Sequence, residues 1–214
     1  MKSKTDTFRQ RAAPRTQREQ KSLARRIQII ETALKLFARH GFDGTSTKTI
    51  AREVGVTEGL IFHYFPTKAD ILTAVLETQH SFANDLRVLL ENAINEPVEK
   101  VLQQIALGWL SRLRQEKGIT LILLSMAQTH SQVARAWYAL IDTGISQLAT
   151  YLQKRVETGE LRKNLPVKTC AHAFFSALIL FFMRYQSLSE AEWQNEKTVF
   201  VEEFIGIWLK GALA

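Results

Sequence analysis

The sequence predicts an all-α protein made of a small N-terminal three-helix unit and a larger helical domain. Apolar residues recur three and four positions apart through most of the chain, which is the spacing of one helix face. No stretch alternates apolar and polar residues in the period of two that a half-buried strand requires. Glycine and proline divide the pattern into short helices before about residue 76 and longer ones after about residue 90. We therefore expect a basic flexible arm over residues 1–24, a helical unit over 25–71 and a second helical domain over 72–214.

The basic arm carries the charge of the protein. Residues 1–26 hold nine basic and two acidic side chains, so they account for the whole formal net charge of +7, and the rest of the chain is neutral. A segment of this composition cannot bury enough apolar surface to fold alone. Its charge suits nucleic-acid phosphates, an anionic membrane surface or plain solvent, and charge alone does not separate these three roles.

The first helix is predicted to end at Gly41. TKTIAREVG (residues 47–55) reads as a short helix that ends in glycine. TEGLIFHYF (57–65) reads as another, with Thr57 as its N-cap and Pro66 after its end. The apolar face of the first helix consists of Ile27, Ile30, Ala33, Leu34, Phe37 and Ala38.

A further helix is expected after Thr67 and Asp70, which have the spacing of a capping pair. Beyond it the apolar periodicity predicts five further helices, most of them longer than the short ones before them. They cover roughly residues 97–115, 119–129, 131–158, 167–186 and 193–212.

The short helices have the signature of a helix-turn-helix, in which two helices are joined by a sharp turn that contains glycine. Ile61 and Phe65 are four residues apart, so they share the face that packs inward. A recognition helix reads bases with its N-terminal residues in the major groove. Gly59 gives up about 1 kcal/mol of helix propensity there and allows the backbone to approach a duplex closely. The outward face would then consist of Glu58, Gly59, Phe62 and His63.

The stretch TSTKTIAREVGVTEGLIFHYFPTKADIL resembles the DNA-binding signature of the tetracycline-repressor-type (TetR) family of transcription regulators. Over about residues 27–76 the helix cap, the Gly-Val turn, the glycine two residues beyond the next cap, the aromatic residues and the lysine all fall in register. The resemblance implies a DNA-binding domain over 25–71. It implies phosphate contacts for Thr47, Tyr64 and Lys68, and base or near-base contacts for Thr57, Glu58, Gly59 and His63. The alternatives are a helix cap for Thr47, partial burial in the core for Phe62, and a solvated surface side chain for His63 or Lys68.

Two positions depart from an ordinary DNA-facing surface. Phe62 stands where the family usually has tyrosine, and it can touch a thymine methyl group but cannot donate to a phosphate. Glu58 is repelled by DNA unless it accepts from a cytosine amino group. Residues 27–70 carry five basic and five acidic side chains, so a positive charge must come from elsewhere. We expect the arm and the adjacent Arg25 and Arg26 to contact the DNA backbone or a minor groove.

The longer helices are expected to form a ligand-binding and dimerisation domain, because the resemblance implies one. A second stretch, ETGELRKNLPVKTCAHAFFSALILFF, is similar to the family's entry into its dimer helix. Apolar pairs four apart on the preceding helices suit a cavity for a largely apolar ligand, with ordinary core as the alternative. The candidate ligand residues are Ile105, Trp109, Leu110, Ile122, Met126, Trp137 and Ile141.

The last two helices are too apolar to face water on all sides, which favours a four-helix interface between two copies. A buried hairpin within a monomer is the alternative. A homodimer would require a near-palindromic operator, and the resemblance favours a repressor, although the residues themselves do not distinguish a repressor from an activator. The candidate interface residues are Phe174, Leu178, Phe181, Phe182, Ile205 and Trp208.

Other functional classes receive little support. The five histidines lack metal-ligand spacing, and no G-x-S-x-G, P-loop or G-x-G-x-x-G motif occurs, so we expect no catalysis, metal or cofactor. The single cysteine, Cys170, excludes a disulfide within the chain. No apolar signal segment is visible, and the apolar run over 173–183 is short of the ~20 residues that span a bilayer, so we expect a cytoplasmic protein. The remaining alternative is a membrane-surface adaptor that uses the basic arm.

Overall fold

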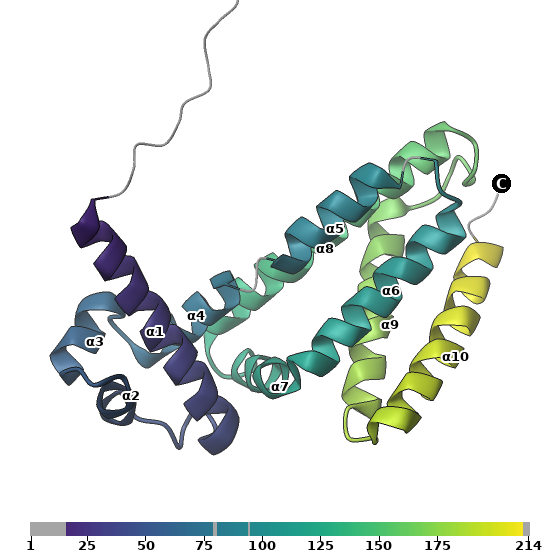
Figure 1. The fold of residues 1–214 in the computed structure, drawn as a ribbon. Helices are drawn as coiled ribbons and strands as arrows, with labels where there is room; N and C mark the ends of the chain where they lie inside the picture. The colour runs from purple at the N-terminus through teal and green to yellow at the C-terminus, as the bar shows by residue number, and fades with distance from the viewer. Residues whose placement is uncertain (1–15, 79–80, 94, 212–214) are drawn as a thin grey trace, which may run out of the picture.

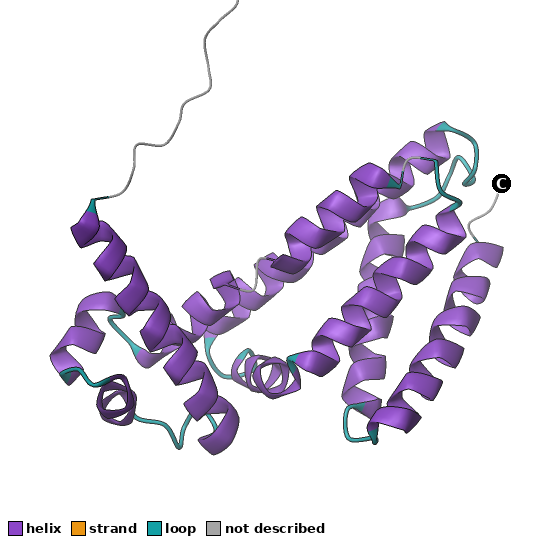
Figure 2. Cartoon of the chain, in the orientation of Figure 1, coloured by secondary structure: helices purple, strands orange, loops and turns teal. Residues whose placement is uncertain are grey.

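The computed structural model describes residues 16–78, 81–93 and 95–211, and within these ranges the chain consists of helices and connecting loops (Figures 1 and 2). Helices α1–α3 gather at one end of the molecule, and α6, α9 and α10 form the other end, with α4 and α7 near the junction (Figure 1). The all-α prediction is confirmed. The helices are α1 (Gln17–His40), α2 (Thr47–Val54), α3 (Glu58–Tyr64), α4 (Lys68–Thr78), α5 (Ser81–Asn92), α6 (Val98–Gln115), α7 (Lys117–Met126), α8 (Ser131–Glu157), α9 (Val167–Tyr185) and α10 (Glu190–Lys210).

Helix α1 begins earlier than the apolar pattern indicates. The Thr16 hydroxyl accepts a hydrogen bond from the Glu19 backbone N–H at 3.2 Å, and the Glu19 carboxylate accepts from the Thr16 N–H at 2.7 Å. This reciprocal capping box starts the helix at Gln17. Residues 17–24 are therefore helical, and the prediction of a flexible arm is wrong for them. The rest of the arm, residues 1–15, lies outside the described residues.

The turn between α2 and α3 is built from local caps. The Ser46 hydroxyl accepts from the Thr49 N–H at 3.0 Å and caps α2. Gly55 ends that helix in the left-handed region, with φ 76° and ψ 40°, where a side chain would be strained. The Thr57 hydroxyl accepts from the Leu60 N–H at 3.3 Å, so Thr57 is the N-cap of α3, as predicted.

The later helices follow the prediction with three differences. Helices α6, α8 and α9 agree with it within one residue at each end, whereas α7 begins and ends slightly earlier than predicted. Helix α5 was not anticipated as a separate element. Helix α10 begins at Glu190 and not at residue 193, because Ser189 and Glu192 form a second capping box.

The buried apolar side chains form two clusters, and the first joins the two parts of the molecule. It contains the cores of α1–α4 and continues into α7 and α8 through Leu123, Val133 and Trp137. The second cluster is formed by α5, α6, α8, α9 and α10. Gly118, near the start of α7, lies so close to α1 that a Cβ there would be 3.5 Å from the Cβ of Ala38. A displacement of α7 or of the start of α8 therefore reaches the helix-turn-helix through direct packing.

Candidate functional site

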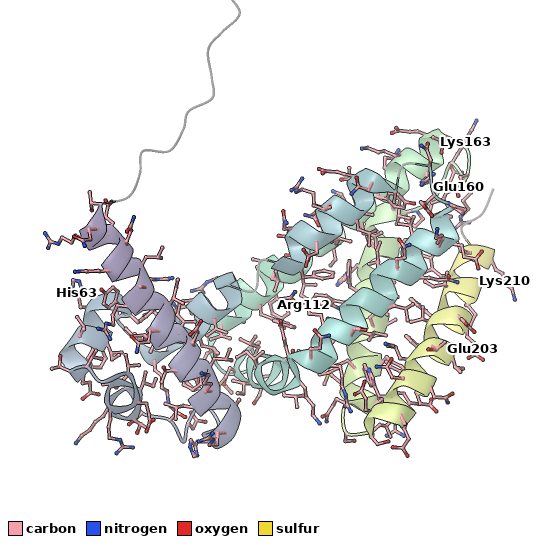
Figure 3. The ribbon with its side chains drawn as sticks, in the orientation of Figure 1. His63, Arg112, Glu160, Lys163, Glu203 and Lys210 are labelled. Atoms are coloured by element: carbon pink, nitrogen blue, oxygen red, sulfur yellow. The ribbon has the colours of Figure 1, made fainter. Side chains whose placement is uncertain are left out.

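Helix α3 has one face anchored in the core and one face open to solvent. Ile61 and Phe65 are 0% and 2% exposed and belong to the first cluster. On the other side Gly59 and His63 are exposed, and Phe62 keeps 47% of its surface in solvent although it is apolar. His63 lies on α3, far along the molecule from Arg112 of α6 (Figure 3). The anchored side fixes the helix rigidly enough for the open side to present a defined pattern to a partner.

Glu58 does not lie free on this surface. The Thr47 hydroxyl donates a hydrogen bond of 2.6 Å to its carboxylate, joining the first residue of α2 to the first residue of α3. Both side chains are partly buried. Thr47 is not the cap of α2, because Ser46 holds that position. No local pattern in the sequence indicates the contact between Thr47 and Glu58.

The start of α1 lies beside the end of α3. The Ser22 and Tyr64 hydroxyls are 3.2 Å apart, and the Arg26 guanidinium lies 5.1 Å from the centre of the Phe65 ring. Arg25 donates to the side chain of Gln28 at 2.9 Å on the same helix. The structure therefore places basic residues of α1 next to the α3 residue for which a phosphate contact is expected.

Lys68 is held by the protein itself. Its ammonium donates to the carbonyl oxygens of Phe42 at 2.7 Å and Thr45 at 2.9 Å, and it lies 4.1 Å from the centre of the Phe42 ring. Burial lowers the pKa of Lys68, and the nearby Asp43 carboxylate partly offsets this effect. An ammonium has three protons, and two of them are committed to the loop between α1 and α2. The alternative of a flexible surface lysine is therefore wrong.

Two contacts join this loop and α4 to the start of α8. The rings of His130 and Phe42 pack edge to face, with ring centres 5.7 Å apart. The Gln132 amide donates to the Asp70 carboxylate, which also caps the start of α4 through Thr67. The hydrogen bonds from Thr67 lower the pKa of Asp70.

A narrow cavity lies where α5, α6, α7 and α8 meet, and it contains two of the expected ligand residues. Trp109 and Trp137 line it, but its volume is only about 30 Å³, roughly the space of one water molecule. Arg112 and Glu116 also line it and form an ion pair at 2.9 Å. Burial raises the pKa of Glu116, and Arg112 opposes that shift. The Trp109 indole N–H is buried and finds no hydrogen-bond partner among the described residues.

The other expected ligand residues do not line this cavity. Ile105 and Leu110 are buried in the second cluster. Met126 is buried in the first cluster, and Ile122 and Ile141 pack against it. Apolar spacing identifies a helix face, but it does not distinguish residues that meet a cavity from residues that fill a core.

Two wider grooves border α8, and neither was anticipated from the sequence. One lies between α5 and α8, has a volume of about 440 Å³, and is lined in part by Arg87, Tyr151 and Arg155. The other, of about 600 Å³, lies between α8 and α9 and is lined in part by Gln153 and Val167. Their linings include charged and polar side chains of the kind that usually marks a solvated helix face.

The expected interface residues on α9 and α10 require a correction. Most of them are buried inside the chain: Phe174, Leu178, Phe181, Phe182 and Ile205 are at most 5% exposed, and Trp208 is partly buried. The large apolar side chains exposed on these two helices are Leu180 (67%), Met183 (51%), Val199 (45%) and Ile207 (70%). Both helices are therefore apolar on more than one side, as predicted, but the residues predicted to meet a partner lie on the side that packs inward.

Helix α9 retains uncovered apolar surface in the single chain. By length and composition it is the one helix within residues 16–78, 81–93 and 95–211 that is apolar enough to cross a membrane, with 33% of its most apolar window buried. A core helix of a soluble protein meets the same criterion.

Comparison with known proteins settles the family. Residues 29–75 match the family described as "Bacterial regulatory proteins, tetR family". Residues 100–203 match "AefR-like transcriptional repressor, C-terminal domain". The chain belongs to the TetR family of transcriptional regulators. TetR-family membership accounts for both parts of the molecule and does not favour the membrane-surface alternative.

Over most of its length the chain is similar to TetR-family proteins at low sequence identity. The chain is 24% identical to the transcriptional repressor AcnR of Corynebacterium diphtheriae over 85% of this chain and 91% of that protein. The fold is similar to that of FadR from Bacillus subtilis in complex with stearoyl-CoA (TM-score 0.70, 18% identity, 86% of this chain and 98% of that chain). It is also similar to that of SmeT in complex with triclosan (TM-score 0.71, 20% identity, 89% of this chain and 92% of that chain). At these identities the two structures show the fold alone.

Proposed function

We propose that this TetR-family regulator is a homodimeric repressor that binds a near-palindromic operator through α3 and is released by a largely apolar small molecule. The observation that carries the proposal is the two-sided α3, with Ile61 and Phe65 buried behind it and Phe62 and His63 open to solvent. Thr57, which caps α3, and Gly59 lie at the end of α3 that enters a major groove in proteins of this architecture.

We assign the phosphate contacts to residues that surround α3. Tyr64 lies beside Ser22 of α1, and Arg25 and Arg26 follow on the same helix. Arginine and tyrosine donors suit phosphate oxygens, and such contacts orient a protein on DNA without reading sequence. We assign Lys68 to the loop between α1 and α2 in place of the phosphate contact expected from the resemblance.

The proposed partner across α9 and α10 is a second copy of the chain. Leu180 and Met183 on α9 and Val199 and Ile207 on α10 expose large apolar side chains, which a solvated monomer rarely retains on neighbouring helices. Pairing these two helices with their counterparts would form a four-helix interface with two-fold symmetry. Two copies of α3 would then lie about one DNA turn apart, ~34–36 Å, or a multiple of it.

The proposed ligand site is the cavity between Trp109 and Trp137. Its present volume of about 30 Å³ is too small for a ligand, so binding requires α7 and α8 to move apart from α6. Trp137 belongs to the same cluster as the helix-turn-helix, and the start of α8 contacts Phe42 and Asp70. Ligand binding would therefore reorient the DNA-binding end. This requires the ligand to bind the form with the opened cavity more tightly than the DNA-bound form.

The relatives support repression and a ligand with a large apolar part. AcnR is named a repressor, and the complexes of FadR with stearoyl-CoA and of SmeT with triclosan each contain a ligand with a large apolar part. A small, largely apolar cavity that must open for a ligand is consistent with the same class of molecule here.

The proposal is tested by selecting duplexes from a random library with the full-length protein, and then adding stearoyl-CoA or triclosan as probes. We expect enrichment of a near-palindromic site and release by at least one of the two apolar probes. Phe62→Ala and His63→Ala should weaken binding, whereas Tyr138→Ala, an exposed aromatic on α8, should not. Failure to enrich any sequence, or equal effects of all three variants, would overturn the assignment of α3.

A further inference from the structure

The hydroxyl proton of Thr47 can be donated either to the Glu58 carboxylate or to a DNA phosphate, but not to both. A threonine hydroxyl has one proton to donate, and that of Thr47 is donated to the Glu58 carboxylate at 2.6 Å. A hydrogen bond to an ionised acceptor is stronger than a neutral one. While this hydrogen bond persists, the Thr47 hydroxyl cannot donate to a DNA phosphate. The neighbouring hydroxyl groups of Ser46 and Thr49 are engaged with each other at 2.9 Å.

Glu58 needs a donor from the DNA before it can give up Thr47. An ionised carboxylate only accepts hydrogen bonds, and it is repelled by the phosphates on both sides of the groove. In the major groove the amino group of cytosine is the donor that suits a carboxylate. Adenine also has an amino group, but its neighbouring N7 is an acceptor that repels a carboxylate.

We propose that this hydrogen bond links two contacts with DNA. Thr47, the first residue of α2, donates to a phosphate only when Glu58 of α3 accepts a hydrogen bond from a cytosine amino group. On the operator, the cytosine amino group takes over the Glu58 carboxylate, and the Thr47 proton turns to a phosphate oxygen. On a duplex with another base at that position, the carboxylate keeps Thr47 and the phosphate contact is not made. One wrong base therefore costs two contacts. Glu58 is the specificity-determining residue and Thr47 the positioning residue.

This inference rests on the proposed function, because it requires α3 to lie in the major groove. It goes beyond that function by joining a backbone contact, which normally carries no sequence information, to the reading of a particular base. The simple alternative is a permanent brace between α2 and α3, in which Thr47 has no influence on base preference.

The test measures the dissociation constant for the selected operator and for versions in which each half-site position is changed to the other three bases. Wild type should prefer cytosine at one position by about tenfold to a hundredfold, as a good base contact does. Glu58→Ala should abolish the preference at that position only. Glu58→Gln should shift it toward adenine, for which glutamine has the matching donor and acceptor.

The decisive variant is Thr47→Val, which removes the hydroxyl and keeps the shape of the side chain. It should weaken the cytosine operator several-fold and leave the other duplexes nearly unchanged, so that discrimination falls. Thr47→Ser keeps the hydroxyl and is the matched control with discrimination retained. Thermal unfolding of each free variant establishes that it is folded, and base discrimination is a ratio that a general loss of folded protein does not change.

Two outcomes overturn the inference. If Thr47→Val weakens all duplexes equally, the phosphate contact is independent of the base, and if it leaves every duplex unchanged, the hydrogen bond is only a brace. A wild-type protein that selects no sequence at all would overturn the proposed function itself, and the two failures are therefore distinguishable.

Discussion

Replacing Lys68 by methionine removes an ammonium from the carbonyl oxygens of Phe42 and Thr45 and leaves an apolar stem of similar length. A hydrogen bond from a charged donor contributes about 1.5–3 kcal/mol when well ordered. Lys68 is only partly buried, and solvent screens its charge. We therefore assign the low end of this energy range to the two hydrogen bonds together. The free energy of unfolding should fall by about 1–2 kcal/mol. The structural change in the folded variant should be confined to the loop that leads into α2.

Urea unfolding measures the loss of stability. DNA binding at several salt concentrations measures whether Lys68 contacts a phosphate. Loosening the loop before α2 should weaken operator binding while the slope of log K against log salt stays the same, because Lys68 neutralises no phosphate in this assignment. Loss of a phosphate contact would instead reduce the slope by about 1. Lys35→Met, at an exposed position on α1, is the control for removing one positive charge. Unchanged unfolding together with a reduced slope would refute the reasoning.

Further predictions concern the core, the interface, the cavity and pH. Phe65→Ala removes a buried ring and should cost about 3–5 kcal/mol of unfolding free energy, measured in urea. Leu180→Glu or Ile207→Glu should shift the protein toward monomer in light scattering, since burial of each apolar side chain is worth about 1–2 kcal/mol per copy. A ligand that opens the cavity should change the fluorescence of Trp137, and a bound ligand with no spectral change would argue against this site. The pKa of Asp70 is lowered in the folded protein, so its ionised carboxylate contributes stability at pH values above the usual pKa near 3.8. This stability is lost as the pH falls through the lowered pKa. Asp70→Asn should therefore unfold with a weaker dependence on pH in that acid range.

Local chemistry made the helix-turn-helix predictable from the sequence. Gly55 provides the left-handed turn and Thr57 provides the cap, and both act within a few residues along the chain. The four-residue spacing of Ile61 and Phe65 identified the buried face of α3. The capping box of Thr16 and Glu19 is equally local, but it lies about three helical turns before the first residue of the apolar pattern. A prediction based on apolar periodicity therefore passes over it.

Contacts between distant segments could not be predicted in this way. Lys68 lies more than twenty residues from the carbonyl groups it holds, and a backbone carbonyl has no signature in the sequence. The face of α9 posed a different difficulty. Leu178 and Leu180 are the same residue type two positions apart, yet the first packs inward at 0% exposure and the second remains 67% exposed. Only the packing of the neighbouring helices around α9 decides between them.

The early start of α1 gives its cations fixed angular positions. A helix of 24 residues is about 36 Å long, and its buried side chains, among them Ile30 and Phe37, fix its rotation. In this orientation Ser22 lies beside Tyr64. Arg18, Arg25 and Arg26 lie three or four residues from Ser22 and therefore turn toward the same side. Inserting one alanine between Ser22 and Leu23 would rotate the preceding turn by about 100° without altering the net charge. The affinity for nucleic acid should therefore depend on the direction in which the positive side chains of α1 point as much as on their number.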